Sequence, residues 1–187
     1  EGGEISGTID DTIRHAVTKL SHVHFVGSPE AKKRVSSMGE IKKNIFNIGS
    51  PDIDVIVNKK IPDIKNVKKR YGIKFKNYSI LVWHPVTSKI ETLKEDTNKI
   101  LAFMNKLDEN FLVIYPNKDQ GSNLILECYN NINNKKYKIL KNMRFEYFLS
   151  LLKNSKYILG NSSSAIYEAP ILETPAINIG DRQYKRI

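Results

Sequence analysis

The chain has 187 residues, 40% of them hydrophobic, which is enough to bury a core in one large domain or in parts of two. Cys128 is the only cysteine, and no apolar run could cross a membrane or serve as a secretory signal, so we expect a reducing, cytoplasmic compartment and no membrane partner. The net charge of +10 comes from 24 lysines and six arginines spread along a chain with 18 asparagines, a bias that disfavours a nucleic-acid surface.

The first third of the chain alternates between predicted helices and strands. Thr8 and Asp11 fit a capping box, and the apolar residues that follow recur at helical spacing. Pro, Asp and Lys interrupt the pattern over residues 51–63, so we predict two domains, 1–52 and 53–187. The elements expected before the boundary are a loop (1–7), a helix from Thr8, a strand (22–26), a helix (28–38) and a strand (44–48).

The rest of the chain continues the same alternation with short links. The strand at 78–83, YSILVW, is continuously apolar, as expected of a strand buried on both faces. Strand and helix in alternation indicate an α/β fold with Rossmann-like parallel sheets. The expected helices are 63–71, 91–110, 122–132, 145–152 and one opened by the serines 162–164; the remaining strands are 111–115, 137–140, 157–159 and 175–179.

Polar side chains follow four of these strands. They are His84, Asn117, the run from Asn161 to Ser164, and Arg182. The carboxyl ends of parallel strands share one edge of a sheet, so all four can line a single crevice. Each has a structural explanation when taken alone, because a serine is a common helix N-cap and a histidine at a strand end is often buried and satisfied.

The turn after the strand at 157–159 is suited to an anion. Gly160 and Asn161 precede three serines, whose hydroxyl groups and backbone N–H groups at a helix start favour phosphate. Glu168 lies four residues after Ser164, where its carboxylate could accept hydrogen bonds from ribose hydroxyls.

Two long motifs carry a resemblance to a known family. G-N-S-S-S-x-x-x-E-A from Gly160 and T-P-A-I-N-I-G-D-R-Q from Thr174 resemble the nucleotide-binding segment of hydrolysing UDP-N-acetylglucosamine 2-epimerases, which serve sialic and nonulosonic acid biosynthesis. The opening run from Glu1, E-G-G-E-x-S-G-T-I-D-D-x-I-R-H-A, resembles the catalytic segment of that family. W-H-P-V-T at Trp83 replaces the His-Arg-Arg-Glu type motif of non-hydrolysing relatives and so favours the hydrolysing branch.

The resemblance implies a role for particular residues. Those that would surround the UDP moiety are His84, Asn117, Ser162, Ser163, Glu168 and Arg182. Ser162 and Ser163 would hold the β-phosphate and Glu168 the ribose. Glu1, Asp10, Arg14 and His84 become the catalytic candidates, for proton transfer and for stabilising the diphosphate. From the residues alone, Asp10, Asp11 and Arg14 could equally be helix-start acids and an i,i+4 ion pair.

The resemblance also implies the architecture and the reaction. It predicts two facing Rossmann-like domains of the glycosyltransferase-B arrangement, a UDP-sugar substrate, no cofactor, and a homo-oligomer when full length. UDP would be eliminated from UDP-N-acetylglucosamine, or from a 4-acetamido-6-deoxy analogue, and water would then add to release the 2-epimeric sugar. The chain begins without methionine, so we expect an internal piece of a longer protein that is inactive alone.

Three alternatives stay open at this level. A sugar transferase of the same architecture would release UDP only in the presence of an acceptor. A Lys-rich nucleic-acid-binding module would bind random DNA with a steep salt dependence and without UDP affinity. His15, His22 and His24 could form a three-histidine zinc site, but no cysteine supports it, and we predict no metal.

Overall fold

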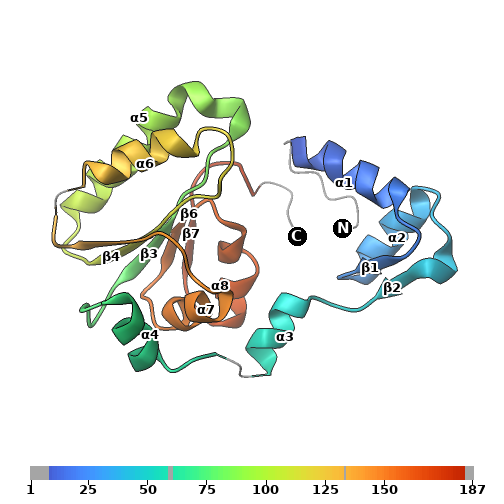
Figure 1. The fold of residues 1–187 in the computed structure, drawn as a ribbon, viewed down its shortest axis with the longest axis horizontal. Helices are drawn as coiled ribbons and strands as arrows, with labels where there is room; N and C mark the ends of the chain where they lie inside the picture. Colours follow the sequence, from blue (N-terminus) through green and yellow to red (C-terminus); the bar gives the residue numbers. More distant parts are fainter. Residues whose placement is uncertain (1–8, 59–60, 133, 184–187) are drawn as a thin grey trace. The chain divides into compact units, whose positions relative to one another are not determined.

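The computed structural model describes residues 9–58, 61–132 and 134–183, with side chains from residue 12 onwards. These residues form two compact units, the first ending at Asn58 and the second at Gln183 (Figure 1). Every strand pairing in either unit is parallel among the described residues. The predicted α/β class with parallel, Rossmann-like sheets is therefore confirmed.

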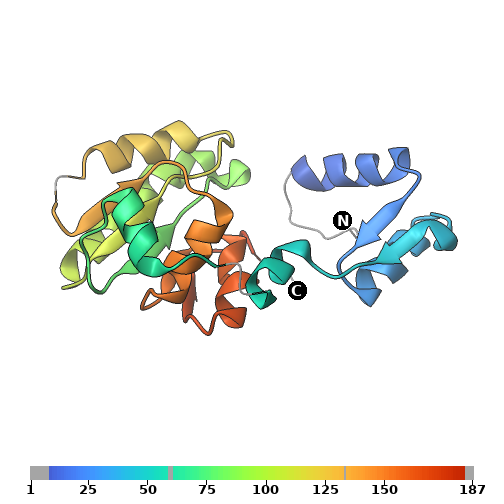
Figure 2. The same ribbon diagram turned by 60° about the horizontal axis from the view of Figure 1, so that its bottom comes forward.

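The first unit contains a two-stranded parallel sheet (Figure 2). Val26 and Ile45 of the sheet pack with Val35 of a helix to form its buried core. The Ser28 hydroxyl accepts a hydrogen bond from the Ala31 N–H at 3.1 Å and so caps that helix. The elements are α1 (Ile9–Leu20), β1 (His24–Val26), α2 (Pro29–Ser37), η1 (Lys42–Asn44), β2 (Ile45–Asn47) and α3 (Pro51–Val57).

The helix α3 lies within residues 51–63, where the sequence predicted an interruption of the pattern and no helix. Pro51 occupies the first helical position, where its missing N–H costs nothing, and Asp52 and Asp54 lie near the positive helix start. The Pro and Asp residues that look like helix breakers in the sequence therefore begin a helix.

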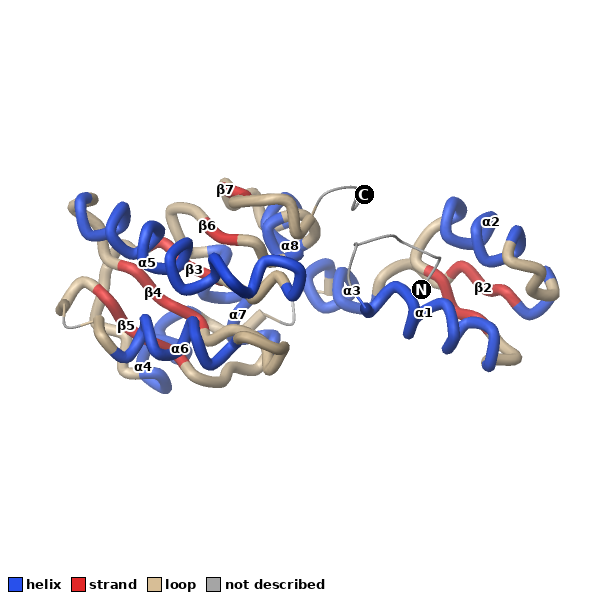
Figure 3. The backbone as a smooth tube through the Cα atoms, turned by 90° about the horizontal axis from the view of Figure 1, so that it is seen from above, coloured by secondary structure: helices blue, strands red, loops and turns tan. Residues whose placement is uncertain are grey.

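The second unit is a five-stranded parallel sheet in the order β5-β4-β3-β6-β7. Helices α5 and α6 cover one face, and α4, α7 and α8 lie on the other (Figures 1 and 3). The elements are α4 (Ile64–Tyr71), β3 (Ser79–Val82), η2 (Thr87–Lys89), α5 (Ile90–Lys106), β4 (Phe111–Ile114), α6 (Ser122–Asn130), β5 (Tyr137–Leu140), α7 (Phe145–Lys153), β6 (Ile158–Gly160), η3 (Ser163–Ala165), α8 (Glu168–Ile171) and β7 (Ala176–Asn178).

The central strand β3 is buried along its whole length, as its apolar sequence predicted. Beyond its end, Trp83 is buried, and its indole Nε1 donates to Thr97 Oγ1 of α5 at 3.2 Å. The strand order runs outwards in both directions from β3, which is the doubly wound arrangement that places ligands at the carboxyl edge. That edge is where the predicted site residues follow the strands.

Candidate functional site

The carboxyl edge of the five-stranded sheet brings together residues from four strands. His84 follows β3, Asn117 follows β4, Asn161 follows β6 and Arg182 follows β7. Hydrogen bonds join His84 to Asn117 and to Asn161, and Arg182 to Asn161. The structure therefore brings the four predicted strand ends into one hydrogen-bonded cluster, although these residues are far apart in the sequence.

His84 is buried, with 7% of its surface exposed, and its ring has a defined hydrogen-bond partner. The backbone N–H of Asn117 donates to His84 Nδ1 at 3.1 Å. Burial, and secondly the positive charge of Arg182, lower the pKa of His84 to about 4. The ring is neutral at pH 7, and because Nδ1 accepts a proton, Nε2 carries the ring hydrogen and can donate to a ligand.

Arg182 places a guanidinium group beside this histidine. Its Nη1 donates to the backbone carbonyl of Asn161 at 3.3 Å, and its Nη2 lies 3.9 Å from Asp119 Oδ2. The guanidinium group retains its charge at any physiological pH and offers donors in a planar fork that matches phosphate oxygens. The cluster therefore combines one permanent cation with one neutral N–H donor.

The serine-rich segment does not form the continuous helix that the sequence predicted. Ser163–Ala165 make a single 3₁₀ turn, and the short α-helix α8 begins only at Glu168. Pro170 explains the difference, because a proline inside a longer helix lacks an N–H and clashes with the carbonyl four residues earlier. In α8 it lies in the first turn, where the missing donor is tolerated.

The two predicted phosphate ligands lie at this turn. Ser162 is buried, and its hydroxyl accepts a hydrogen bond from the Ser164 N–H at 3.3 Å; Ser163, half-buried, opens the turn. Glu168, the predicted ribose ligand, is half-buried at the start of α8. Since the segment is not one helix, Glu168 and Ser164 do not share a helical face, and that part of the argument is wrong.

A cavity of about 330 Å³ adjoins the cluster. Asn161 and Arg182 contribute to its wall, and the Lys89 Nζ–Asp181 Oδ2 ion pair, 2.7 Å long, lies beside it. The rest of the wall combines the charged residues Asp96 and Lys99 with Gly180 and five apolar residues: Trp83, Val86, Leu93, Ile100 and Ile179. A volume of this size lies within the range of small-molecule sites.

The remaining catalytic candidates belong to the first unit. Glu1 lies outside the described residues, and Asp10 lies in α1 with a side chain that is outside them. Arg14 lies on α1 and is half-buried. The structure therefore shows that Asp10 and Arg14 share one helix, one turn apart, as the sequence predicted.

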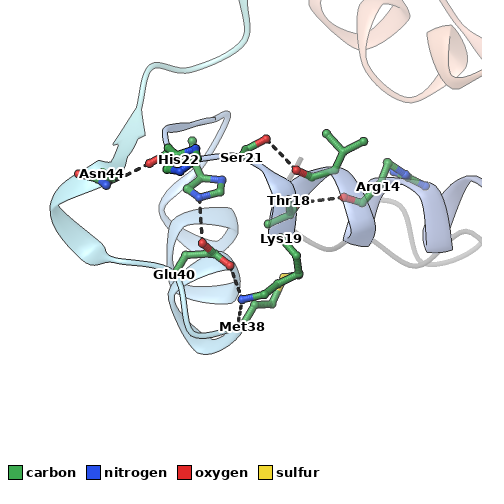
Figure 4. A network of polar contacts seen from close by, with 10 residues as sticks. Arg14, Thr18, Lys19, Ser21, His22, Met38, Glu40 and Asn44 are labelled. Carbon is green, nitrogen blue, oxygen red and sulfur yellow. Dashed lines mark hydrogen bonds and ion pairs between the residues drawn. The ribbon is translucent and has the colours of Figure 1, made fainter.

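A polar network holds α1 against the rest of the first unit (Figure 4). Glu40 Oε1 lies 2.6 Å from Lys19 Nζ of α1, and Glu40 Oε2 lies 3.2 Å from His24 Nε2 of β1. Lys19 Nζ also donates to the Met38 carbonyl at 3.2 Å. The helix that carries Asp10 and Arg14 is thus tied to β1 and to the end of α2.

No group of three or more His, Cys, Asp or Glu side chains among the described residues could hold a metal ion. His24, one member of the conceivable three-histidine site, pairs with Glu40. No helix within residues 9–58, 61–132 and 134–183 is both long and apolar enough to cross a bilayer.

The sequence analysis did not predict Gln183 as a residue of the cluster, and it gave Asn161 no role of its own. Gln183 is buried, and its Nε2 donates to the Asn161 carbonyl at 2.7 Å, as Arg182 does. Asn161 itself was noted only as part of a polar strand end. The one sequence signal for Gln183 was its position next to Arg182 at the end of the G-D-R-Q motif.

The chain was compared with known proteins. The profile of a family described as UDP-N-acetylglucosamine 2-epimerase matches residues 1–187. A UDP-N-acetylglucosamine 2-epimerase of Neisseria meningitidis serogroup B is 42% identical over 186 residues, which are 100% of this chain and 49% of that protein. A GDP/UDP-N,N'-diacetylbacillosamine 2-epimerase (hydrolyzing) of Campylobacter jejuni is 38% identical over 192 residues, 100% of this chain and 50% of that protein.

The fold was also compared with solved structures. UDP-GlcNAc 2-epimerase of Methanocaldococcus jannaschii, in complex with UDP-GlcNAc and UDP, superimposes with a TM-score of 0.71 at 22% identity, covering 96% of this chain and 52% of that one. At this identity the match establishes a shared fold. The chain spans about half the length of the curated relatives it matches.

Proposed function

The chain belongs to the UDP-N-acetylglucosamine 2-epimerase family, and from this premise we propose that the intact protein is a hydrolysing 2-epimerase of a UDP-N-acetylhexosamine. A base removes the proton from C2 of the sugar while the C1–O bond to UDP breaks, which leaves a C1=C2 double bond. Water then adds its hydroxyl group at C1 and a proton is delivered to C2 from the other face. The products are UDP and the free 2-epimeric sugar, N-acetylmannosamine when the substrate is UDP-N-acetylglucosamine.

The observation that carries this proposal is the convergence of polar strand ends in the second unit. Elimination adds one negative charge to the diphosphate as it departs with UDP, and donors that are already in place lower the barrier for that step. The charged Arg182 guanidinium and the neutral His84 Nε2–H are donors of this kind. The remaining proposed contacts are Ser162 and Ser163 to the β-phosphate, Glu168 to the ribose, and Asn117 to the UDP moiety.

The proton transfers at C2 are assigned to acidic residues of the first unit. Glu1 and Asp10 are the proposed acid and base, and Arg14 is proposed to bind diphosphate. A carboxylate is a suitable base only when it is placed within hydrogen-bond reach of the C2 proton. Turnover in deuterated water by the E1Q and D10N variants tests which carboxylate removes the proton and which returns it.

The hydrolysing course rests on two observations. His84 is followed by Pro-Val-Thr and not by the Arg-Arg-Glu type sequence of non-hydrolysing relatives. The Campylobacter jejuni relative at 38% identity carries the word hydrolyzing in its name. We further propose that residues 1–52 and 53–187 belong to separate Rossmann-like domains and that the intact protein is a homo-oligomer.

The decisive experiment is turnover of UDP-N-acetylglucosamine by the intact protein in deuterated water. We expect free N-acetylmannosamine with deuterium at C2 and one UDP per sugar. A 4-acetamido-6-deoxy UDP-sugar is tested in parallel, because the same UDP site would serve both. Unlabelled sugar, or UDP release that requires an added acceptor, would reject the proposal; the second result would identify a sugar transferase, which the comparisons do not favour.

A binding measurement tests the site separately from the chemistry. Truncation in R182A removes the cation of the cluster, and we expect UDP to bind roughly 10- to 100-fold more weakly, as for loss of hydrogen bonds to a charged group. The matched control is K106A, which removes an exposed cation at the far end of α5. Equal losses in both variants would show that Arg182 contributes only through the net charge.

A further inference from the structure

The side chain of Asn161 bonds to both polar groups of one backbone residue. Its Oδ1 accepts the His84 N–H at 2.7 Å, and its Nδ2 donates to the His84 carbonyl at 2.8 Å. The β3–β6 ladder ends at the pair Val82 and Gly160, and Asn161 N–H donates to the Val82 carbonyl at 3.1 Å. The amide of Asn161 therefore extends the pairing of the two strands to His84.

The backbone carbonyl of Asn161 accepts two further hydrogen bonds. Gln183 Nε2 donates to it at 2.7 Å and Arg182 Nη1 at 3.3 Å. Asn161 is 1% exposed and Gln183 is 5% exposed, so solvent does not compete for these bonds. One buried residue thus connects the ends of three strands, β3, β6 and β7.

We propose that Asn161, supported by Gln183, is a positioning residue that sets His84 and Arg182 at the correct spacing for a bound diphosphate. This inference rests on the proposed function, because it assigns a ligand to the cluster. Asn161 is not a catalytic residue, since its carbonyl and both ends of its side-chain amide are bonded to other protein groups. It acts through His84 and Arg182.

The position requires an amide. The side chain must accept from an N–H and donate to a carbonyl at the same time, which Asn does and an ionised Asp does not. Alanine would leave the buried N–H and carbonyl of His84 without partners, at the full cost of desolvating them. An ionised carboxylate would face the His84 carbonyl oxygen, whereas a protonated one would restore the original pattern of donor and acceptor.

The first test is a mutant cycle on the intact protein with UDP as the probe. In N161A we expect UDP affinity and kcat/KM to fall roughly 10- to 100-fold, as for two lost hydrogen bonds in a buried site. In the H84A/R182A background the same truncation should change either quantity less than about threefold, because groups that act as one unit are not additive. An equal factor in both backgrounds overturns the proposal.

The second test needs no ligand. NMR titration of the His84 ring in N161A should show its pKa rising from about 4 towards 6.5, because the ring is no longer held in its buried position. An unchanged titration curve together with unchanged UDP affinity overturns the proposal. If the wild-type protein fails to bind UDP, the proposed function fails, while the titration still reports whether Asn161 positions His84.

Two further variants separate positioning from a loss of folding. N110A removes a side-chain amide that donates to the Asn77 carbonyl at 3.3 Å. Asn110 lies just before β4, at the opposite edge of the sheet from the site, so N110A should leave UDP affinity within about twofold of wild type.

N161D keeps the shape of the side chain. Its UDP affinity relative to wild type should be highest near pH 5, where a buried carboxyl is protonated, and should fall as pH rises; a pH-independent ratio contradicts the requirement for an amide.

Discussion

The Asn117 backbone N–H donates to Nδ1 of His84 at 3.1 Å, and this single bond places the ring proton of a buried histidine on Nε2. Because β4 and β3 are neighbours, the bond forms without any side chain of Asn117 taking part. A neutral ring with a fixed tautomer can donate a hydrogen bond but supplies no positive charge, so Arg182 is the permanent cation of the cluster.

This arrangement predicts how stability depends on pH. The folded-state pKa of His84 is about 4 and its ordinary value is 6.5, so between these values the unfolded chain binds more protons than the folded one. Stability should therefore fall by about 3 kcal/mol as pH drops through that window. Denaturant unfolding of wild type and H84Q between pH 4 and 7 measures this change in the free energy of unfolding. The difference in unfolding free energy between the two proteins should shrink towards pH 4. The exposed-histidine variant H22Q should follow wild type.

Gly160 is required by the close approach of β6 to β3. A Cβ atom at this position would lie 1.9 Å from the Val82 carbonyl oxygen, and the residue has φ of +132°. We expect G160A to lose about 3 kcal/mol of stability or more, since backbone and not a flexible side chain must move. Gly180 also has a positive φ, of +79°, but no atom lies within 4 Å of its Cβ position. G180A should lose only about 1 kcal/mol, and equal losses in chemical denaturation would argue against the steric explanation.

Glu40 should control how firmly α1 is held in the first unit. The hydrogen bond from Lys19 is the main reason that the pKa of Glu40 lies below its ordinary value of 4.5. The stabilisation contributed by the ionised Glu40 is therefore fully present above pH 4.5 and is lost as the pH falls through the lowered pKa of the folded state. We expect E40Q to speed amide hydrogen exchange across α1 at pH 7, with the difference from wild type vanishing in acid. E95Q breaks the exposed Glu95–Lys99 pair of α5 and should leave α1 exchange unaltered.

Glu109 offers a test of the sheet edge that lies away from the site. Its carboxylate accepts from Tyr157 at 2.7 Å and Ser79 at 3.2 Å, and it pairs with Lys156 at 2.9 Å. E109A should lose about 2 kcal/mol of stability, because hydrogen bonds to a charged group are lost in a partly buried place. UDP affinity should stay at the wild-type value in calorimetric titration of the folded protein. A weakened affinity would mean that the two edges of the sheet are coupled.

Much of the fold could be read from local patterns. The apolar run at 78–83 and the helical spacing of the segments around it predicted β3 and its neighbours, because burial on both faces of a parallel strand demands continuous apolar sequence. Local patterns gave wrong predictions at two prolines, because a proline can either begin a helix or end one. Pro51 begins a helix that was predicted as an interruption, and Pro170 divides a serine-rich helix that was predicted as continuous.

By itself, the sequence determined the order of the elements, the polar residues that follow each strand and the motifs of the family. Only the tertiary structure decided which of those residues meet. Asn161 and His84 are 77 positions apart, and their contact depends on β6 lying next to β3 in the sheet. The tautomer of His84 and the role of Gln183 follow from the same adjacency, because hydrogen bonds between strand ends depend on strand order and not on local sequence.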